Sequence, residues 1–421
     1  SYTKPIQASD LVFPNPIQSN ADLALFAQRL LRPHIGRGVR ALFIFTVVES
    51  FVTLLICAFL IFKRRQSGKF WLFTKRTTTF GTFIVPNTVT VLVCGVAAYL
   101  VAGIIFTAVI IGYGYDETKP FMEWLWVVPG HWVILDLAAF YSVYGFILSC
   151  SPKSPLCNSP LWTSLKRRWL FFPLPTSPWL MNGLVLIVGP AFMTTWITLM
   201  SYAGTTWYSH SKPLVLSFMS KLDDITPGQM SDAVDPALMG DARVVWASVL
   251  EVTRYVQLGL TTADVLMVMN WLALLAYGMA NQANLVLHAY DMYPHDVPHP
   301  TVWSKFVFIM TKGRPGNTSE AAFGSFESTA GEIYQRTWKM TIFCLCQASM
   351  MLGSLPLFMG AIKILLIWGW KALYVEADIT YCMNVSFVYV AIISICTCTY
   401  LVAYSTVITL DPLFKAVLGI H

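Results

Sequence analysis

Six ionisable side chains lie within stretches of sequence that are otherwise apolar, and their chemical types point to binding. They are Glu49, His131, Asp136, Arg254, Asp264 and Lys363. At the centre of a bilayer such a group costs about 2.5 to 3.5 kcal/mol unless it is paired or hydrated. Asp136 lies nearest the middle of its stretch, and its short side chain cannot extend to the membrane surface. We therefore expect Asp136 to be the central residue of a ligand-binding site.

These ionisable groups are expected to share a cavity. With the N-terminus outside, all six lie between the outer surface and the middle of the membrane, which predicts a hydrated, outward-facing cavity built from the first, third, fifth and sixth helices. The predicted ligand-binding residues are His131, Asp136, Asp264, Asn270 and Lys363. Alternatively, the two basic side chains extend to the interface and the carboxylates are held by structural hydrogen bonds.

A stripe of polar residues runs along the fifth apolar stretch. At 100° per residue its members fall within about 60° of arc. They are Asn270, Tyr277, Asn281, Asn284 and His288. Such a stripe avoids lipid, so it predicts a conformational relay or a pore lining; the alternative is hydrogen bonding that only joins helices.

Seven long apolar stretches must position these side chains. Hydrophobic residues make up 56% of the 421 residues and charged residues 12%, against roughly 25% charged in soluble domains. The stretches cover residues 41–62, 83–112, 122–150, 179–203, 242–288, 338–370 and 385–410. Because hydrocarbon cannot satisfy a free backbone, these are read as helices. The predicted fold class is all-α, a polytopic membrane protein with a seven-transmembrane-helix bundle.

Four of the seven stretches contain prolines. Pro86, Pro129, Pro190 and Pro356 fall in the second, third, fourth and sixth. A proline in a membrane helix usually bends it, so these four helices are expected to be kinked.

The chain divides into three predicted parts. Residues 1–40 form an N-terminal segment, residues 41–410 form the bundle, and residues 411–421 form a short tail. Within the first part, residues 20–31 place Leu23, Phe26, Leu30 and Leu31 at helical spacing. This predicts an amphipathic helix that lies on the membrane surface, or one that caps the bundle.

The distribution of Lys and Arg predicts the orientation. Sixteen lie in the odd-numbered loops and the tail, and five lie in the other loops, or ten when the first forty residues are included. Because basic loops stay in the cytoplasm, we expect the N-terminus outside and the C-terminus inside, in the plasma membrane.

The largest predicted cytoplasmic loop joins the fifth and sixth helices. Asn317 with Glu320, and Thr329 with Glu332, have the spacing of helix-capping boxes. Helix six is therefore expected to begin well before Trp338. The apolar residues 302–310 are expected to rest on the membrane or on a partner. A cytoplasmic transducer could dock on this loop; the alternative is a passive loop along the membrane.

Several functions are excluded by missing motifs. The sequence has no phosphate-binding Gly-rich loop, no H-E-x-x-H, no G-x-S-x-G and no aspartyl-protease signature, so no enzyme activity is expected. Most of the nine cysteines fall inside predicted helices, without a metal-ligand pattern. We expect no cofactor and no metal. The net charge of +6 lies near the membrane and favours acidic lipids over nucleic acid.

Seven helices in this orientation resemble the plan of G-protein-coupled receptors. The resemblance is one of topology, because residues 142–145 read Ser-Val-Tyr-Gly where the rhodopsin-like class has Asp-Arg-Tyr, and Asp411-Pro412 replaces Asn-Pro-x-x-Tyr. Pro356 matches the switch region of the sixth helix. A divergent class such as the fungal receptors fits better, and it implies sensing of an extracellular small molecule or peptide with signalling through the loop between helices five and six.

The last helix is similar to that of the gustatory and odorant receptor channels. Thr399-Tyr400 is followed by residues 401–405, and Thr406 and Val407 replace the Gln-Phe of that family. This resemblance implies a ligand-gated cation channel with a tetrameric pore near helix seven and an N-terminus inside. A channel, a small-molecule transporter and a homo-oligomer therefore stay open beside the receptor.

Overall fold

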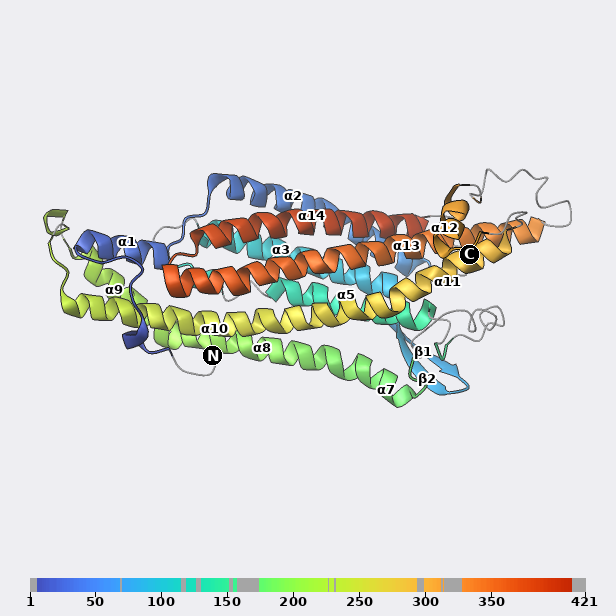
Figure 1. Cartoon of the computed structure of the whole chain (residues 1–421), viewed down its shortest axis with the longest axis horizontal. Coiled ribbons are helices and arrows are strands. Elements are labelled where there is room, and N and C mark those ends of the chain that lie inside the picture. The colour runs from blue at the N-terminus through green and yellow to red at the C-terminus, as the bar shows by residue number, and fades with distance from the viewer. Residues whose placement is uncertain are drawn as a thin grey trace.

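The structure is a computed structural model that describes residues 6–68, 70–114, 119–125, 130–150, 154–156, 174–225, 227–230, 232–293, 299–311, 313 and 328–410. The tail 411–421 and the pair Asn317 and Glu320 lie outside these ranges. Within them, seven helices are long and apolar enough to cross a membrane. They run along the long axis of one elongated bundle (Figure 1). The predicted all-α, seven-helix membrane fold is confirmed.

The first two spanning helices are joined by a β-hairpin that the sequence did not predict. Helix α2 covers Arg37–Gln66 and α3 covers Thr88–Gly114, and between them β1 (Phe73–Thr78) pairs antiparallel with β2 (Gly81–Pro86). The predicted start of the second helix at residue 83 is therefore wrong. Pro86 ends the strand instead of bending a helix, and the side chain of Asn87 caps α3 by accepting from the backbone N–H of Thr90 at 3.2 Å.

The third spanning helix is α5 (Gly130–Cys150), which comes after the short α4 (Met122–Leu125). Pro129 lies outside the described residues. Helices α3 and α5 approach closely at Gly95, where an added Cβ would overlap the Cβ of Ala138. A residue without a side chain at this point lets the two backbones pack together.

The fourth spanning helix is longer than predicted and contains two π-helical turns. It runs from α7 (Pro178–Gly183) through a π-turn, Leu184–Val188, into α8 (Gly189–Thr206). A second π-turn, Trp207–Ser211, leads into α9 (Lys212–Asp223). Each π-turn is followed within two residues by a proline, Pro190 or Pro213. The wider turn accommodates the ring and the missing N–H of the proline, so the helix continues through both sites.

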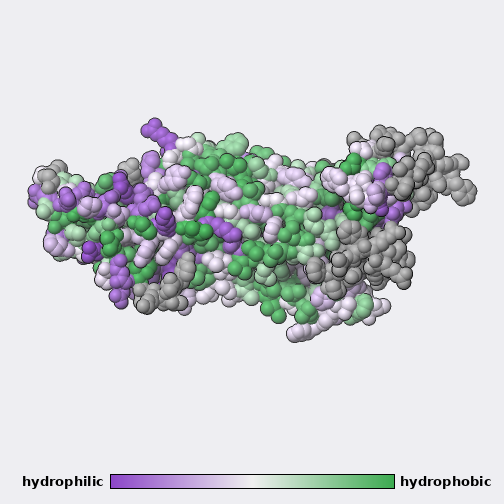
Figure 2. Space-filling view, in the orientation of Figure 1, coloured by the Kyte–Doolittle hydropathy of each residue, from purple (hydrophilic) through white to green (hydrophobic). Residues whose placement is uncertain are grey.

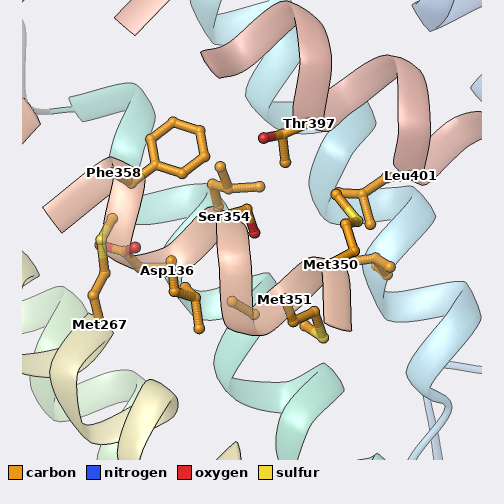
Figure 3. A pocket seen from close by; sticks show the side chains of 12 residues that line it. Asp136, Met267, Met350, Met351, Ser354, Phe358, Thr397 and Leu401 are labelled. Carbon is orange, nitrogen blue, oxygen red and sulfur yellow. The ribbon is translucent and has the colours of Figure 1, made fainter. Parts of the chain in front are cut away.

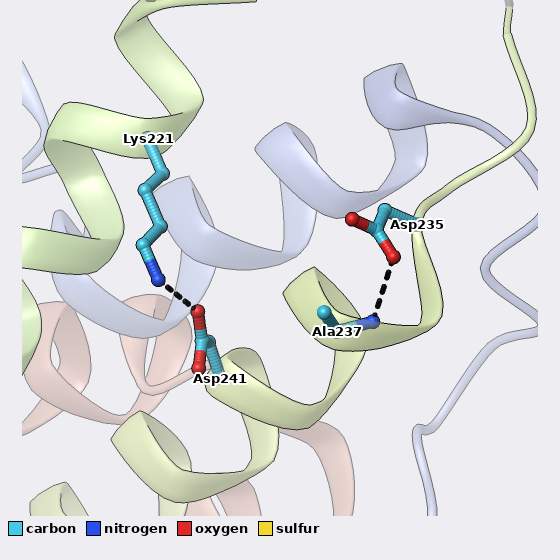
Figure 4. A network of polar contacts seen from close by, with 4 residues as sticks. All are labelled: Lys221, Asp235, Ala237 and Asp241. Carbon is cyan, nitrogen blue, oxygen red and sulfur yellow. Dashed lines mark hydrogen bonds and ion pairs between the residues drawn. The ribbon is translucent and has the colours of Figure 1, made fainter.

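The fifth spanning helix extends over 57 residues. It comprises α10 (Pro236–Ala273), a π-turn at Leu274–Gly278 and α11 (Met279–Met292). At 1.5 Å per residue its length is about 85 Å, so it projects beyond a hydrocarbon core of about 30 Å. Where α9 and α10 project, Lys221 pairs with Asp241 at 2.6 Å and Asp235 caps α10 by accepting from the backbone N–H of Ala237 (Figure 4).

The N-terminal segment packs on this projecting end (Figure 1). Helix α1 covers Asn20–Leu31, as predicted, and begins with a capping box between Ser19 and Asp22. Phe26 meets Trp246 of α10 edge to face, with the ring centroids 5.6 Å apart. Leu23 and Leu30 are buried. The apolar side of α1 is therefore covered by protein, which agrees with the cap alternative for this helix.

The sixth spanning helix begins at Ser328, so the prediction that it starts well before Trp338 is confirmed. Helix α13 (Ser328–Lys363) contains Pro356 and continues through π-turns at Ile364–Gly369 and Ala372–Glu376. Helix α14 (Thr380–Leu410) is the seventh. The predicted apolar segment 302–310 forms α12 (Val302–Thr311), whose Ile309 is buried against α11 and α13.

The outer surface agrees with a membrane-spanning bundle. Apolar residues gather over the middle of the molecule, and hydrophilic residues gather at the end formed by α1, α9 and the start of α10 (Figure 2). Along the spanning helices, large apolar side chains such as Phe45, Phe51 and Ile187 are exposed. This is an integral membrane protein whose spanning helices contact lipid.

Candidate functional site

Asp136 lines a small internal cavity where five spanning helices meet (Figure 3). The side chain of Asp136 is 1% exposed. The cavity volume is about 30 Å³, enough for about two water molecules. Apart from Asp136, its polar lining comes from Ser354 of α13 and Thr397 of α14. The cavity in this conformation therefore has room only for a very small polar molecule, and a larger ligand requires the helices to separate.

The carboxyl group of Asp136 is incompletely bonded. Its Oδ2 atom has no hydrogen-bond partner among the described residues. Around it lie apolar and aromatic groups: Met267 and Phe358 line the cavity, and Phe358 packs edge to face on Trp132 with centroids 5.9 Å apart. A buried acceptor without a donor is costly, so this oxygen is available to a donor or a cation that enters the cavity.

Two further predicted site residues interact electrostatically with Asp136, one directly and one through its neighbour. The carboxyl group of Asp264 is close enough to influence that of Asp136, and the charge of Lys363 in turn influences Asp264. Asp264 is partly buried with an unpartnered Oδ1, and Lys363 is exposed. Neither lines the cavity. Of these three predicted residues, only Asp136 lies at the cavity wall.

The other predicted site residues lie elsewhere. His131 is near the start of α5, and its side chain is outside the described atoms. Asn270 of α10 is 3% exposed, does not line the cavity, and its Nδ2 has no partner among the described residues. Arg254 is partly buried on α10.

Glu49 is held by structural hydrogen bonds. Its Oε1 accepts from the hydroxyls of Thr53 and Thr399, both at 2.8 Å, and so joins α2 to α14. The first spanning helix, which was predicted to contribute to the cavity, does not line the cavity at Asp136. The second and seventh spanning helices take its place through Leu92 and Thr397, because the first helix packs at the outside of the bundle, against α3 and α14.

The polar stripe on the fifth helix is divided by the π-turn at Leu274–Gly278. A π-turn adds about one residue to a turn and so rotates the rest of the helix by roughly 100°. Asn270 lies before the rotation, Tyr277 lies within it, and Asn281, Asn284 and His288 lie after it. The assumption of one straight stripe at 100° per residue is wrong. Asn270, Asn281 and Asn284 are nevertheless buried inside the bundle.

For most of the residues that line the cavity, nothing in the sequence indicates that they belong to a site. Met267, Ser354, Phe358 and Thr397 are ordinary residues of apolar helices, and only contacts between helices bring them together. The sequence analysis did not select Gln282, which lies beside the polar stripe. The three amide residues within Asn-Gln-Ala-Asn at 281–284 could have indicated it. It donates to the carbonyl of Cys344 at 2.7 Å.

Three side chains on one face of α10 donate hydrogen bonds to carbonyl groups of the sixth spanning helix. Trp271 Nε1 donates to Leu352 O at 3.2 Å, and Trp246 Nε1 donates to Leu373 O at 2.8 Å. Between them, Gln257 Nε2 donates to Leu366 O at 3.5 Å. The carbonyl of Leu352 is the one that loses its helical partner to Pro356, four residues later. Helix α10 therefore satisfies the carbonyl that Pro356 leaves without a helical partner and also bonds to carbonyls in the two later π-turns.

Among the described residues, no group of three His, Cys, Asp or Glu could hold a metal ion. In comparisons with known proteins, no protein-family model, no curated protein and no solved structure matches this chain.

Proposed function

We propose that this membrane protein is a seven-helix receptor that senses an extracellular small molecule or peptide through the cavity at Asp136. It acts by binding and signalling, without enzyme activity. The observation that carries the proposal is the buried, unpartnered Oδ2 of Asp136 in a cavity shared by five spanning helices. A ligand that donates to this oxygen changes the packing of all five helices at once.

Helix α13 supports this function because it connects the cavity to the cytoplasmic side. Ser354 and Phe358 line the cavity on either side of Pro356. At this proline the helix lacks one backbone hydrogen bond, and Trp271 of α10 satisfies the freed carbonyl. A ligand that displaces α13 or α10 competes with this bond, so Pro356 is a natural pivot for a two-state change.

The N-terminal part of α13 contacts α12 and can pass this movement on. Trp338 Nε1 donates to the carbonyl of Ile309 in α12 at 3.1 Å, and the hydroxyl of Tyr334 donates to the carbonyl of Gly313. Helix α12 leaves Trp303 71% exposed. Rotation of α13 about Pro356 therefore displaces α12, and a cytoplasmic transducer that contacts α12 would detect it.

The proposed orientation places the N-terminus outside and the C-terminus in the cytoplasm, in the plasma membrane. The excess of Lys and Arg in the loops at the end with α12 and the hairpin supports it. The cavity must then open towards the end at which α1, α9 and the start of α10 lie.

The decisive experiment compares two charge-neutralising variants in cells that respond to the ligand. We expect Asp136→Asn to abolish or strongly weaken the response while surface expression stays unchanged. Asp241→Asn is the matched control, because this carboxylate is exposed on the projecting end of α10. A normal response of Asp136→Asn at normal expression would remove Asp136 from the binding site.

A ligand-gated channel is the second candidate, and buried amides along α11 favour it. Asn281 and Asn284 are fully buried with unpartnered oxygens, as expected of residues that face a polar path. The purified protein in a pure lipid bilayer distinguishes the two functions. A ligand-evoked current would establish the channel, and accumulation of substrate in vesicles would establish a transporter.

A further inference from the structure

Arg64, near the end of α2, is a buried cation whose contacts within the bundle are neutral. The residue is 7% exposed. Its Nη1 donates to the hydroxyl of Thr90 on α3 at 3.2 Å, and its Nε has no partner among the described residues. A hydroxyl supplies a hydrogen bond but no negative charge, and burial of an uncompensated charge is costly. The charge of Arg64 is therefore not neutralised by the described contacts.

The helices around Arg64 contain no carboxyl group that could neutralise it. Helix α2 packs against α3 and α14, and neither Thr88–Gly114 nor Thr380–Leu410 contains an Asp or a Glu. Residues 50–114, which include the rest of α2, the hairpin and α3, contain six basic residues and no acidic residue. Positive charge at this end of α2 is therefore concentrated without acidic residues beside it in the sequence.

The first turn of α3 adds positive potential at the same point. Thr90 is the third residue of this helix, so its bond to Arg64 holds the guanidinium against the helix N-terminus. The N-terminus of a helix carries partial positive charge and favours anions. An anion at this point interacts favourably with the guanidinium and with the helix. The hydroxyl of Thr90 accepts from Arg64 and can donate its own hydrogen to the same anion.

The depth of Arg64 in the membrane and the shape of its side chain indicate which anion binds. Helix α2 has 30 residues, so it is about 45 Å long and its ends extend past a hydrocarbon core of about 30 Å. Arg64 is two residues before the end, at the depth of the lipid headgroups, and the adjacent Lys63 and Arg65 are exposed. The planar fork of a guanidinium matches two oxygens of a phosphate group.

We propose that Arg64 and Thr90, at the N-terminus of α3, form a binding site for a phosphate group, which a phospholipid headgroup supplies. The bound phosphate joins α2 to α3. The site is separate from the cavity at Asp136, because neither residue lines that cavity. The proposal does not depend on the proposed function, since a receptor, a channel and a transporter could each contain such a site.

Thermal unfolding of the purified full chain in uncharged detergent micelles tests the site and the source of the phosphate. The additions are dioctanoyl phosphatidic acid, dioctanoylglycerol as the matched lipid without phosphate, and inorganic phosphate against chloride at equal ionic strength. We expect phosphatidic acid to raise Tm by several degrees and dioctanoylglycerol to leave it unchanged. An equal rise with inorganic phosphate would support the site and assign it to free phosphate. No rise with either phosphate compound would refute the site.

Three variants locate the binding. Arg64→Gln should abolish the rise in Tm caused by phosphatidic acid, whereas Arg65→Gln, the exposed neighbour with the same change of charge, should keep it. Thr90→Val retains the shape of the side chain and the charge of Arg64, so it should reduce the rise, and it provides the test if Arg64→Gln does not fold. If Arg64→Gln or Thr90→Val shows the full rise, phosphate binds elsewhere and the assignment is wrong.

Discussion

Two carboxyl groups at membrane depth differ in their hydrogen bonds. The difference distinguishes a residue with a structural role from a candidate binding residue. Glu49 accepts two hydroxyl donors, whereas Oδ2 of Asp136 has no partner among the described residues. A bonded carboxylate contributes to stability, and an unpartnered buried one opposes it. Residues that oppose stability are typical of binding sites.

Neutralising these two residues should therefore have different effects on the free energy of unfolding. Glu49→Gln keeps an acceptor and loses the charge, so we expect the free energy of unfolding to fall by about 1 kcal/mol. Asp136→Asn removes a carboxyl group that lacks a donor, so we expect no loss. Thermal unfolding in detergent micelles measures both, and a large loss for Asp136→Asn would assign that residue a structural role.

The capping residue of α1 predicts a pH dependence. Hydrogen bonds from the backbone and side chain of Ser19 hold the pKa of Asp22 below its ordinary value of 3.8. A carboxyl group with a lowered pKa stabilises the fold above its unfolded pKa, and this contribution is lost as pH falls through the folded pKa. We expect the first turn of α1 to become less stable below about pH 4. Limited proteolysis of α1 as a function of pH measures this, and Asp22→Asn should remove the pH dependence.

Among the elements, irregular turns in the spanning helices are matched by donors on neighbouring helices. Pro356 frees the carbonyl of Leu352, and Trp271 donates to it. Trp246 and Gln257 donate to carbonyls of the two later π-turns in the same way. Helix α10 therefore fixes the path of the sixth spanning helix over most of its length.

A double-mutant cycle tests the bond at Pro356. Trp271→Phe leaves the carbonyl of Leu352 without a donor, so we expect a loss of about 1 to 3 kcal/mol in the free energy of unfolding. In the background of Pro356→Ala the backbone N–H of residue 356 satisfies that carbonyl, so the same substitution should cost less. Additive effects of the two substitutions would show that the bond from Trp271 does not compensate for the proline.

The approach of α3 to α5 gives another prediction with a control on the same helix. An added Cβ at Gly95 would overlap Ala138, whereas one at Gly103 would meet nothing within 4 Å. We expect Gly95→Ala to lower the free energy of unfolding by about 1 to 3 kcal/mol. Gly103→Ala should be neutral or stabilising by up to about 1 kcal/mol. Similar results at the two positions would contradict the close packing.

Across the whole molecule, the two ends of the bundle differ in what they present. One end has α1, α9 and the start of α10 around Trp246, and the other has the hairpin and α12 (Figure 1). The proposed orientation assigns the first end to the outside. Antibodies against terminal tags should reach the N-terminal tag in intact cells and the C-terminal tag only after permeabilisation. The reverse result would favour the channel over the receptor.

Elements whose formation depends on local composition could be predicted from the sequence. Seven apolar stretches predicted seven spanning helices, the spacing of Leu23 and Phe26 predicted α1, and Thr329 with Glu332 predicted an early start of helix six. Long apolar runs must form helices in a bilayer because no water is present to satisfy the backbone. The apolar run through residues 83–86 misled the prediction of the second helix, since the strand β2 has the same composition.

How these elements meet depends on the folded molecule. The cavity at Asp136 combines Leu92, Met267, Ser354 and Thr397 from four other helices, and the carbonyl of Leu352 finds its donor 81 residues away in Trp271. The spanning helices are apolar over most of their circumference, so hydropathy does not indicate which face turns inward. That choice depends on side-chain packing and on the pairing of polar groups between helices, and both are properties of contacts between residues far apart in the chain.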